Sequence, residues 1–390
     1  MPHRRSSTPR HHRALYAIIL VCVALGGMMV IRSASASSSS FSSGAPPPCD
    51  AAASTALLYR ATTATSSSDD TADLSAAIGG LWERKMATKD IFKTVLSAKS
   101  LSVRKIATDL NDLASSFVVV LNPSRAQKRM ERPPSEVEPV LRPWSEKGFN
   151  FGKVGAREVM FRLQEGVGGA NSAVNAGGFA CATESALAAA PHSVVVNVSP
   201  FDMHSSLLVP FIRERRPQAL EEDALRVALR FAAAHVRDGG SGDVANAAAL
   251  RRAGNPTPLR VGFNSGGGGA SVNHLHFQIW RPAGGILPVE YAATLASRPL
   301  RDGAGGVRIS ELADGYPVRG FVLDGVRRSE AAREAAARAV SRCAARLAAG
   351  SFPFPSSPAL PFNLVLTGDR IFFWPRQEMH LFLPKNMDKK

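Results

Sequence analysis

The residues best suited to chemistry are two histidines spaced by two in the segment 271–280, SVNHLHFQIW. Nine histidines are present, and His274 and His276 are the one pair with this spacing. A neutral imidazole keeps a free lone pair near neutral pH, since its pKa is about 6.5, and it is a good nucleophile toward phosphorus. The pair is also a common metal-ligand arrangement on a strand, so a metal site stays open from the spacing alone.

A glycine-rich segment precedes the histidines. Gly266–Gly269 follow Asn264-Ser265 and lead through Ala270-Ser271 into the histidine segment. Glycines let backbone N–H groups approach phosphate oxygens closely, although such a run is also typical of a simple flexible turn. Phosphate-binding amides beside an imidazole nucleophile together favour phosphoryl transfer.

The histidines must be held by regular structure, and the alternation from His274 to Trp280 predicts a strand. Side chains two apart on a strand share one face and lie roughly 6.6 Å apart along it. The pattern therefore predicts a polar wall on an apolar backing. The wall consists of His274, His276 and Gln278, and the backing of Leu275, Phe277 and Ile279.

Further elements are predicted from the same periodicities. Amphipathic helices are expected after Pro217, with acids in the first turn, and from Arg327 to Leu347. Strands are expected at 117–121, 194–198, 206–211, 260–263 and 274–280, with two more flanking the Gly368-Asp369 turn. Strands and helices without regular alternation favour an α+β fold with an antiparallel sheet and flanking helices.

At this point the chain resembles a known family. Ser271-Val272-x-His274-x-His276 resembles the histidine-triad signature, and His-x-His-x-Gln is the variant of its nucleotidyltransferase branch. Longer segments are similar to the GDP-L-galactose phosphorylase and GDP-D-glucose phosphorylase family, across about residues 81–377. These segments are WERKM, FVVVLNPSRAQKRMERPP, FNFGKVGAREVMF, VNVSPFDMHSSLLVP, FNSGGGGASVNHLHFQ and NLVLTGDRIFFWPRQ.

The resemblance implies a histidine-triad-like α+β fold and a reaction. GDP-hexose and inorganic phosphate would give GDP and hexose 1-phosphate through a GMP group carried on His276. His274 would orient that nucleophile and Gln278 would hydrogen-bond the phosphoryl oxygens. Substrate contacts are expected from the remaining site candidates, which are Asn264, Ser265, Gly267, Ser271, Asn150 and Lys153. Neither a metal nor another cofactor is required by this scheme.

Two departures from the family are visible. The family has a bulky aromatic residue in the loop occupied here by Gly266–Gly269, and a Gly-His pair where this chain has His204-Ser205. Two other functions stay open: a histidine-triad hydrolase of nucleotide conjugates, and a catalytically weak, membrane-anchored nucleotide-binding protein. The identity of the hexose is not fixed, and a homodimer is allowed.

The N-terminal region carries a targeting signal. Arg4, Arg5, Arg10 and Arg13 precede the uncharged apolar run 14–31, and Ala34-Ser35-Ala36 could be a signal-peptidase site. We expect a basic tail with a transmembrane or signal segment at 1–36, a Ser/Thr/Ala-rich disordered linker at 37–80 and a catalytic region at 81–385. Basic residues before the apolar run favour a single-pass type II membrane protein with a lumenal catalytic part, in the Golgi or endoplasmic reticulum. Delivery to a plastid by a signal plus transit sequence is the alternative.

Composition adds weaker constraints. The 47 Lys and Arg against 32 Asp and Glu give a formal charge of +15, which favours an anionic partner such as a nucleotide or a membrane surface. The arginines are scattered and no aromatic RNA-binding signature accompanies them, so no nucleic-acid partner is expected. The four cysteines are far apart and form no Cys-x-x-Cys pair, which argues against a zinc ribbon or a redox motif.

Overall fold

A computed structural model provides the structure of the chain. It describes residues 56–61, 68–96, 100–107, 116–123, 139–165, 178–182, 184–234, 258–300, 304–314, 316–351 and 358–376. The predicted membrane or signal segment at 14–31 lies outside these ranges. Within the described residues, no helix combines the length and apolar character that crossing a membrane requires.

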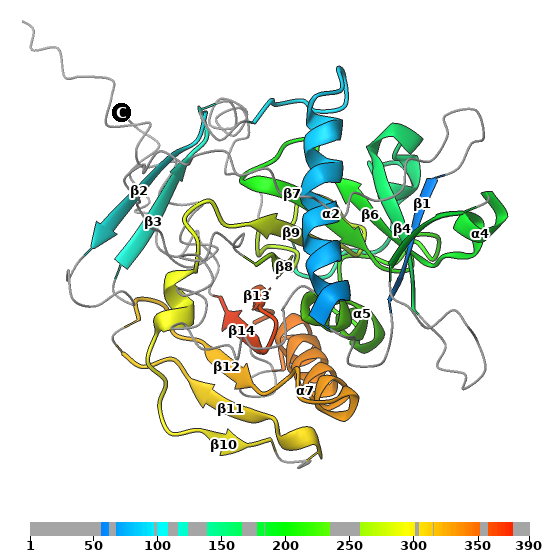
Figure 1. Cartoon of the computed structure of the whole chain (residues 1–390). Coiled ribbons are helices and arrows are strands. Elements are labelled where there is room, and N and C mark those ends of the chain that lie inside the picture. Colours follow the sequence, from blue (N-terminus) through cyan, green and yellow to red (C-terminus); the bar gives the residue numbers. More distant parts are fainter. Residues whose placement is uncertain are drawn as a thin grey trace, which may run out of the picture.

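The described chain is mainly β-structure with four α-helices (Figure 1). The helices are α2 (Ser68–Met86), α4 (Glu184–Ala189), α5 (Glu222–Ala233) and α7 (Glu330–Ala348). The strands in the first half are β1 (Ala56–Ala61), β2 (Ser102–Ala107), β3 (Ser116–Leu121), β4 (Val159–Glu165), β5 (Gly178–Ala182), β6 (His192–Val196) and β7 (Met203–Val209). Those in the second half are β8 (Arg260–Asn264), β9 (Phe277–Arg281), β10 (Arg298–Pro299), β11 (Arg308–Glu311), β12 (Phe321–Asp324), β13 (Phe362–Leu366) and β14 (Arg370–Pro375).

Twelve of the strands form one sheet in the order β10-β11-β12-β14-β13-β8-β9-β7-β6-β4-β1-β5. Every pairing in it is antiparallel except that of β1 with β4, and β2 and β3 form a separate antiparallel pair. The predicted α+β class with a mostly antiparallel sheet is confirmed. The central strands β8 and β9 pair with each other, and β9 also pairs with β7, so the residues around β9 lie in the middle of the sheet.

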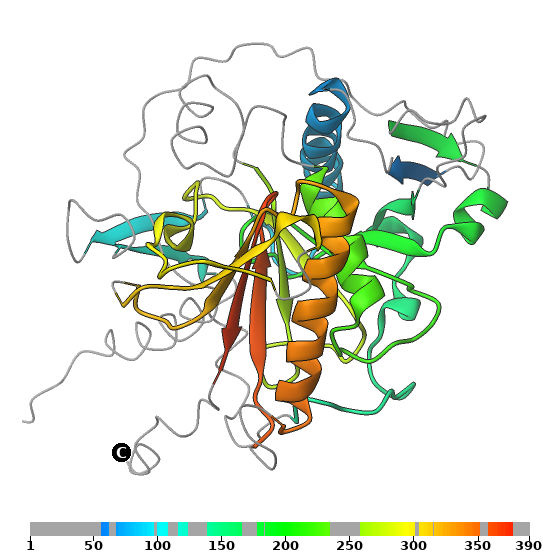
Figure 2. The ribbon, with the colours of Figure 1, turned by 90° about the horizontal axis from the view of Figure 1, so that it is seen from below.

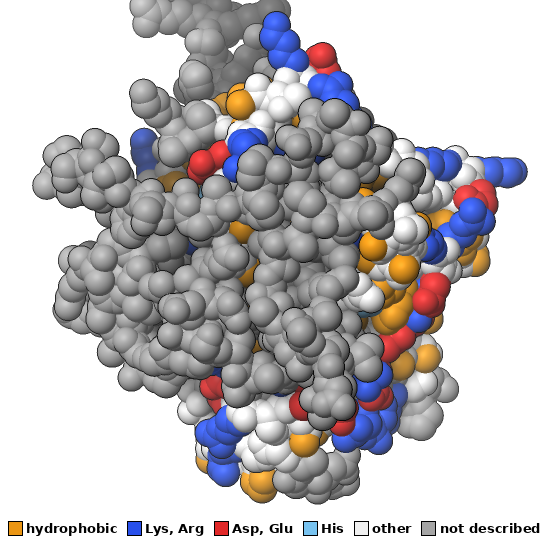
Figure 3. All heavy atoms as spheres, turned by 45° about the vertical axis from the view of Figure 1, so that its right-hand side comes forward, with side chains coloured by type: hydrophobic (Ala, Val, Ile, Leu, Met, Phe, Trp, Pro, Cys, Tyr) orange, Lys and Arg blue, Asp and Glu red, His pale blue; other side chains and the backbone are white. Residues whose placement is uncertain are grey.

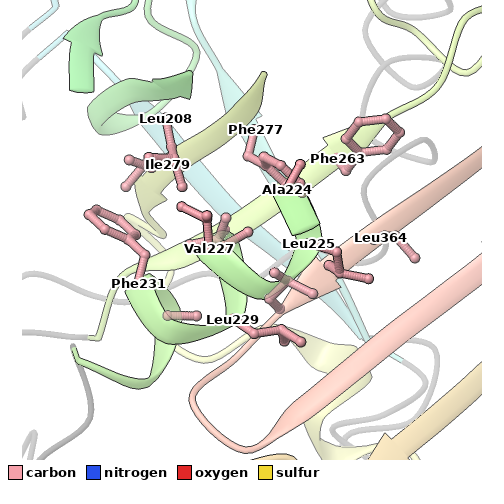
Figure 4. Close-up of a cluster of buried hydrophobic side chains, with 14 of the residues drawn as sticks. Leu208, Ala224, Leu225, Val227, Leu229, Phe231, Phe263, Phe277, Ile279 and Leu364 are labelled. Atoms are coloured by element: carbon pink, nitrogen blue, oxygen red, sulfur yellow. The ribbon is translucent and has the colours of Figure 1, made fainter. Parts of the chain in front are cut away.

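Helices α2, α5 and α7 pack on one face of the sheet (Figures 1 and 2). The apolar residues of α5, including Leu225, Val227 and Phe231, lie against Phe277 and Ile279 of the sheet (Figure 4). Phe277 and Ile279 are completely buried, as is Leu275 before the strand. The predicted apolar backing of the histidine segment is therefore confirmed, because these three side chains join the core beneath the helices.

The opposite face of the sheet has two smaller apolar clusters. One is built around Trp280 and Trp374, and the other around Phe151 and Leu207. The segment 139–155 lies over the second cluster and contributes the buried Phe151 to it. This face, which the three helices leave uncovered, is the one toward which the polar residues of the histidine segment alternate.

Two predicted boundaries are corrected. Helix α2 begins at Ser68 and strand β1 at Ala56, so the folded part starts before residue 81, inside the predicted linker. From Leu74 onward, α2 buries Leu74, Ile78 and Trp82 in the main core, and this burial outweighs the weak helical signal of its Ser- and Ala-rich start. Strand β9 begins at Phe277, so the two histidines precede the strand instead of lying on it.

Charged side chains of both signs share the surface near α5 and α7. Arg230 pairs with Glu330 and Arg226 with Glu334, linking the two helices, while Arg333 pairs with Glu330 along α7. Figure 3 shows basic and acidic side chains interspersed on the described surface of the side it presents. On this side, part of the basic excess of the chain is balanced locally by acids.

Candidate active site

His276 has one ring nitrogen held and one free. Its Nδ1 lies 2.7 Å from the backbone oxygen of His274. A carbonyl oxygen can only accept, so Nδ1 carries the hydrogen and the lone pair of the neutral ring is on Nε2. Among the described residues, none forms a hydrogen bond with Nε2. The arrangement therefore presents a neutral imidazole with an available nucleophilic nitrogen.

His274 has the opposite tautomer. The backbone N–H of Phe151 donates to its Nδ1 at 3.0 Å, so Nδ1 accepts and Nε2 carries the hydrogen in the neutral ring. The side chain is fully buried, and within the described part of the chain its Nε2 has no hydrogen-bond partner. The Trp144 ring meets the imidazole edge-on, with centroids 4.8 Å apart. His274 thus presents an unsatisfied donor next to a potential nucleophile.

Burial keeps both rings neutral. Loss of solvation lowers the pKa of His276 to about 4, against the opposing effect of the hydrogen bond to the His274 carbonyl. Burial and the neighbouring His276 lower the pKa of His274 to about 4, while Glu146 acts in the opposite direction. Both imidazoles are therefore deprotonated at neutral pH, which is the state that a nucleophile at His276 requires.

The backbone of His276 forms hydrogen bonds with the side chain of Gln218 instead of with a neighbouring strand. Gln218 accepts from the His276 N–H through Oε1 at 2.9 Å and donates to the His276 carbonyl from Nε2 at 3.1 Å. The preceding residue, Leu275, donates its N–H to the carbonyl of Arg216. These contacts explain why β9 starts at Phe277: the segment 216–218 takes the place of a neighbouring strand. Leu275 is nevertheless fully buried, as the alternation in the sequence predicts.

Asn264 and Ser265, which precede the glycine loop, form hydrogen bonds with Phe362 and Asn363 of β13 and with the loop itself. Ser265 Oγ accepts from the N–H of Phe362 at 2.8 Å and donates to the carbonyl of Gly266 at 3.0 Å. Asn363 on β13 donates from Nδ2 to Asn264 Oδ1 at 2.5 Å and to the Gly268 carbonyl at 2.8 Å. Both predicted substrate contacts therefore have hydrogen-bond partners within the protein. The Ser265 hydroxyl both accepts and donates, whereas the Asn264 side chain accepts through Oδ1.

Two glycines of the loop have identifiable roles. A Cβ on Gly266 would lie 2.5 Å from the carbonyl oxygen of Val140, so only glycine fits against the segment 139–140. Gly267 has a φ of +67° and is exposed at the tip. Ser271, which follows the loop, is exposed and has no side-chain hydrogen bond to a described residue. Of the predicted substrate contacts in this segment, Gly267 and Ser271 are thus the two that are exposed and open to a ligand.

The two predicted contacts from the segment 146–153 differ in their freedom. Asn150 is buried, its Oδ1 accepts from the N–H of Gly152, and its Nδ2 has no partner among the described residues. Lys153 donates from Nζ to the carbonyls of Glu146 and Gly148, each at 2.7 Å. Asn150 is adjacent in sequence to Phe151, whose N–H donates to His274. Lys153 is engaged in closing its own loop.

Gln278 lies on β9 opposite Leu207 of β7 and Gly262 of β8. It is partly exposed, and within the described residues its side chain has no hydrogen bond. By alternation along the segment it shares a face with His276. The structure therefore brings His274, His276, Gln278 and the glycine loop to the face opposite the helices.

Sequence reasoning missed two residues that organise the site. Gln218 lies 58 residues from His276, and Asn363 lies 99 residues from Asn264. Neither stands in a motif that reports its contacts. Only the position of Gln218 directly after Pro217, before a helix, marks it as part of an ordered connection.

The metal alternative gains no support from the geometry. Within the described part of the chain, no group of three or more His, Cys, Asp or Glu side chains is placed to hold a metal ion. His274 also uses its Nδ1 as an acceptor for a backbone N–H, and His276 uses its Nδ1 as a donor.

Comparisons with known proteins point in one direction. The family profile described as "GDPGP1-like, N-terminal domain" matches residues 73–239. GDP-L-galactose phosphorylase 1 of Arabidopsis thaliana is 30% identical over 264 residues, which cover 67% of this chain and 50% of that protein. GDP-D-glucose phosphorylase 1 of Homo sapiens is 33% identical over 201 residues, covering 52% of this chain and 42% of that protein. The chain spans about half the length or less of the curated relatives that it matches.

A solved structure also matches, over 77% of this chain and 82% of its own. It is the crystal structure of yeast Ap4A phosphorylase Apa2, with 18% sequence identity and a TM-score of 0.46. At this TM-score the likeness does not define the fold.

Proposed function

We propose that the chain belongs to the GDP-L-galactose and GDP-D-glucose phosphorylase family and that it is a GDP-hexose phosphorylase with a histidine-triad-like active site. GDP-hexose and inorganic phosphate are converted to GDP and hexose 1-phosphate. His276 carries the GMP group between the two half-reactions. This scheme requires no metal.

The free Nε2 of His276 is the observation that carries the proposal. In the first step its lone pair attacks the α-phosphorus, a P–N bond forms, and the bond from that phosphorus to the bridging oxygen breaks. Hexose 1-phosphate leaves with the electron pair of that bond, as a stable anion. In the second step a phosphate oxygen attacks the same phosphorus, the P–N bond breaks, and GDP is formed with the imidazole restored.

The partner of Nδ1 also supports this chemistry. Guanylylation of Nε2 makes the ring cationic, because Nδ1 keeps its hydrogen. The carbonyl of His274 lies 2.7 Å from that N–H and would stabilise the charge. Such a hydrogen bond strengthens in the transition state, which is the condition under which an interaction accelerates a reaction.

Unsatisfied donors are available for the phosphoryl oxygens. The Nε2–H of His274 and the Nδ2 of Asn150 are buried without partners among the described residues. A buried donor without a partner costs roughly 1–3 kcal/mol, and an anionic ligand oxygen would remove that penalty. Gly267 and Ser271 are open to the same ligand, and Gln278 completes the proposed set.

The test is to detect the intermediate and follow its fate. Incubation with GDP-L-galactose or GDP-D-glucose without phosphate should add the mass of one GMP to the intact chain, and the adduct should map to His276. Addition of inorganic phosphate should discharge it as GDP. If the adduct forms on another residue, or if water discharges it as fast as millimolar phosphate does, the proposed reaction is wrong.

We also propose, from the sequence alone, that the run 14–31 targets the protein to a membrane, with the catalytic part in the lumen of the Golgi or endoplasmic reticulum or delivered to a plastid. The test is fractionation and microscopy of the full-length tagged chain beside a variant with Leu20→Arg and Val23→Arg. The intact run should give a membrane-bound or organelle-enclosed protein, and the substituted run should release it. Recovery of the full-length protein in the cytosol would contradict the proposal.

A further inference from the structure

Gln218 makes an unusually complete contact with the backbone of the proposed nucleophile. The side chain is 3% exposed and lies in the connection between β7 and α5. Its amide pairs with both the N–H and the carbonyl of His276, at 2.9 and 3.1 Å. A third hydrogen bond runs from the same Nε2 to the carbonyl of Asn264, at 2.9 Å. One amide group therefore joins the nucleophile to the residue from which the glycine loop begins.

The backbone around Gln218 is itself held by hydrogen bonds and ion pairs. The Gln218 N–H donates to Asn273 Oδ1 at 3.1 Å, and Asn273 Nδ2 donates to the carbonyl of Pro143 at 2.9 Å. Arg216, two residues earlier, is held by three carboxylates, those of Glu214, Glu221 and Asp223. Since its own backbone is held in this way, Gln218 can impose a position on His276.

His276 needs such support because it lies outside the sheet. The ladder between β7 and β9 extends only to Phe277, which pairs with Leu208. The ring of His276 is oriented by the hydrogen bond to the carbonyl of His274, which belongs to the same segment before β9. The direction of Nε2 toward a phosphate in the glycine loop thus depends on the Gln218 amide.

We infer that Gln218 is a positioning residue, which sets the distance and direction of His276 Nε2 relative to the phosphate held at the glycine loop. The inference rests on the proposed function for its catalytic consequence. Misplacement of a reacting atom by about 1 Å can cost a rate factor of about 10². Gln218 touches no reacting atom, so the loss should fall on the chemical step and leave substrate binding nearly intact.

The choice of variants follows from the space around the side chain. A hollow of about 360 Å³, lined by Leu141, Arg142, Pro143, Pro217, Gln218 and Ala219, borders it. An alanine would let water from this hollow reach the freed backbone groups. Gln218→Met keeps the volume and removes all three hydrogen bonds. Gln218→Glu keeps an acceptor and one donor while protonated, but its carboxylate would face the carbonyls of Asn264 and His276 and donate to neither.

The experiment measures single-turnover formation of the GMP adduct, together with kcat and KM, from pH 5 to 8. Gln218→Met should slow adduct formation about 100-fold at every pH, with KM within about 3-fold of the wild type. Gln218→Glu should approach the wild-type rate at pH 5 and lose it as the pH rises, with an apparent pKa that the wild type lacks. Val340→Ala, at a buried position of α7, controls for a general loss of stability and should keep the wild-type rate per folded molecule.

A second measurement does not depend on turnover. In ¹⁵N-histidine spectra of the free protein, His276 should show a single Nδ1–H tautomer in the wild type and a mixture in Gln218→Met. Wild-type kinetics and an unchanged tautomer in Gln218→Met would overturn the positioning role. If the wild type forms no GMP adduct, the proposed function fails, and the tautomer comparison still decides whether Gln218 orients the ring.

Discussion

Two buried histidines, His204 on β7 and His276 just before β9, give the clearest comparison within the molecule. Burial lowers the pKa of both His276 and His204 to about 4. His204 also lies beside Arg281, which lowers its pKa further, while Glu83 acts in the opposite direction. Both of its ring nitrogens are occupied: Arg281 Nε donates to Nδ1 at 2.9 Å, and Nε2 lies 3.5 Å from Glu83 Oε1. Among the described residues, the ring of His276 has one hydrogen-bond partner, the carbonyl of His274.

The difference shows that burial and a lowered pKa do not by themselves mark a catalytic histidine. The Trp82 ring packs edge-on against His204, with centroids 5.5 Å apart, and a Cβ on Gly79 would lie 3.2 Å from the imidazole, so helix α2 closes over it. His204 is thereby used to join α2 to β7 and β9. His276 keeps an unpaired nitrogen, which is what a nucleophile needs.

The largest expected effect comes from removing each imidazole. His276→Ala should abolish the GMP adduct and lower kcat/KM by at least about 10⁴-fold, since no other group in the motif can take the place of the nucleophile. His204→Ala should leave kcat/KM per folded molecule within about 10-fold. Steady-state assays and intact-mass spectra of both variants test this pair. Equal losses in the two variants would remove the distinction between the histidines.

The second test uses pH. The pKa of each of four histidines, His192, His204, His274 and His276, is lowered to about 4 by burial. Below about pH 6.5 the unfolded chain binds protons that the folded chain refuses, so stability is full above that pH and declines toward pH 4. Burial raises the pKa of Asp202 to about 7, which favours the folded state as the pH falls through the same window, but one acid opposes four histidines.

The free energy of unfolding should therefore fall by at least about 2 kcal/mol between pH 7 and pH 5 in denaturant titrations. His204→Gln should flatten this slope. The kcat/KM of the wild type should show no protonation of the nucleophile above pH 5. An activity loss with an apparent pKa near 6.5 would mean that His276 is solvated like an ordinary histidine.

The third test measures how much the hydrogen-bonded ring nitrogens of His204 contribute to the free energy of unfolding. His204→Ala removes the acceptor of Nε of the partly buried Arg281, and a hydrogen bond to a charged group is worth roughly 1.5–3 kcal/mol. We expect a loss of stability in that range, measured by urea unfolding at pH 7. His204→Gln supplies an amide oxygen to Arg281 and should recover part of it. Full stability in His204→Ala would show that the contact with Arg281 is not structural.

The smallest expected effect is at Gln278, which shares the face of His276. An amide cannot titrate, so it activates water poorly, whereas an imidazole at this position could exchange a proton with water. Gln278→His should raise the ratio of GMP to GDP released by about 10-fold, measured by chromatography in millimolar phosphate. An unchanged ratio, or a wild type that already makes mainly GMP, would favour a histidine-triad hydrolase.

Much of the fold could be predicted from local patterns. The acids Glu222 and Asp223 at the start of α5 and the apolar alternation from Leu275 to Ile279 are both where the sequence placed them. Such signals are local, because side chains two apart on a strand, or four apart on a helix, share a face regardless of the rest of the fold. The start of β9 and the start of the folded part were wrong, because each depends on a partner from elsewhere: Gln218 replaces a strand at His276, and the main core stabilises α2.

The sequence by itself determined which residues can do the chemistry: a histidine pair beside a glycine loop, on an apolar backing, with Gln278 next in the alternation. Only the tertiary structure decided which nitrogen is free and which histidine is purely structural. The hydrogen bonds that decide this join His276 to Gln218 across 58 residues, and His204 to Arg281 across 77. The reactivity of an imidazole depends on the partner of each nitrogen, and a linear pattern does not encode partners that folding alone brings together.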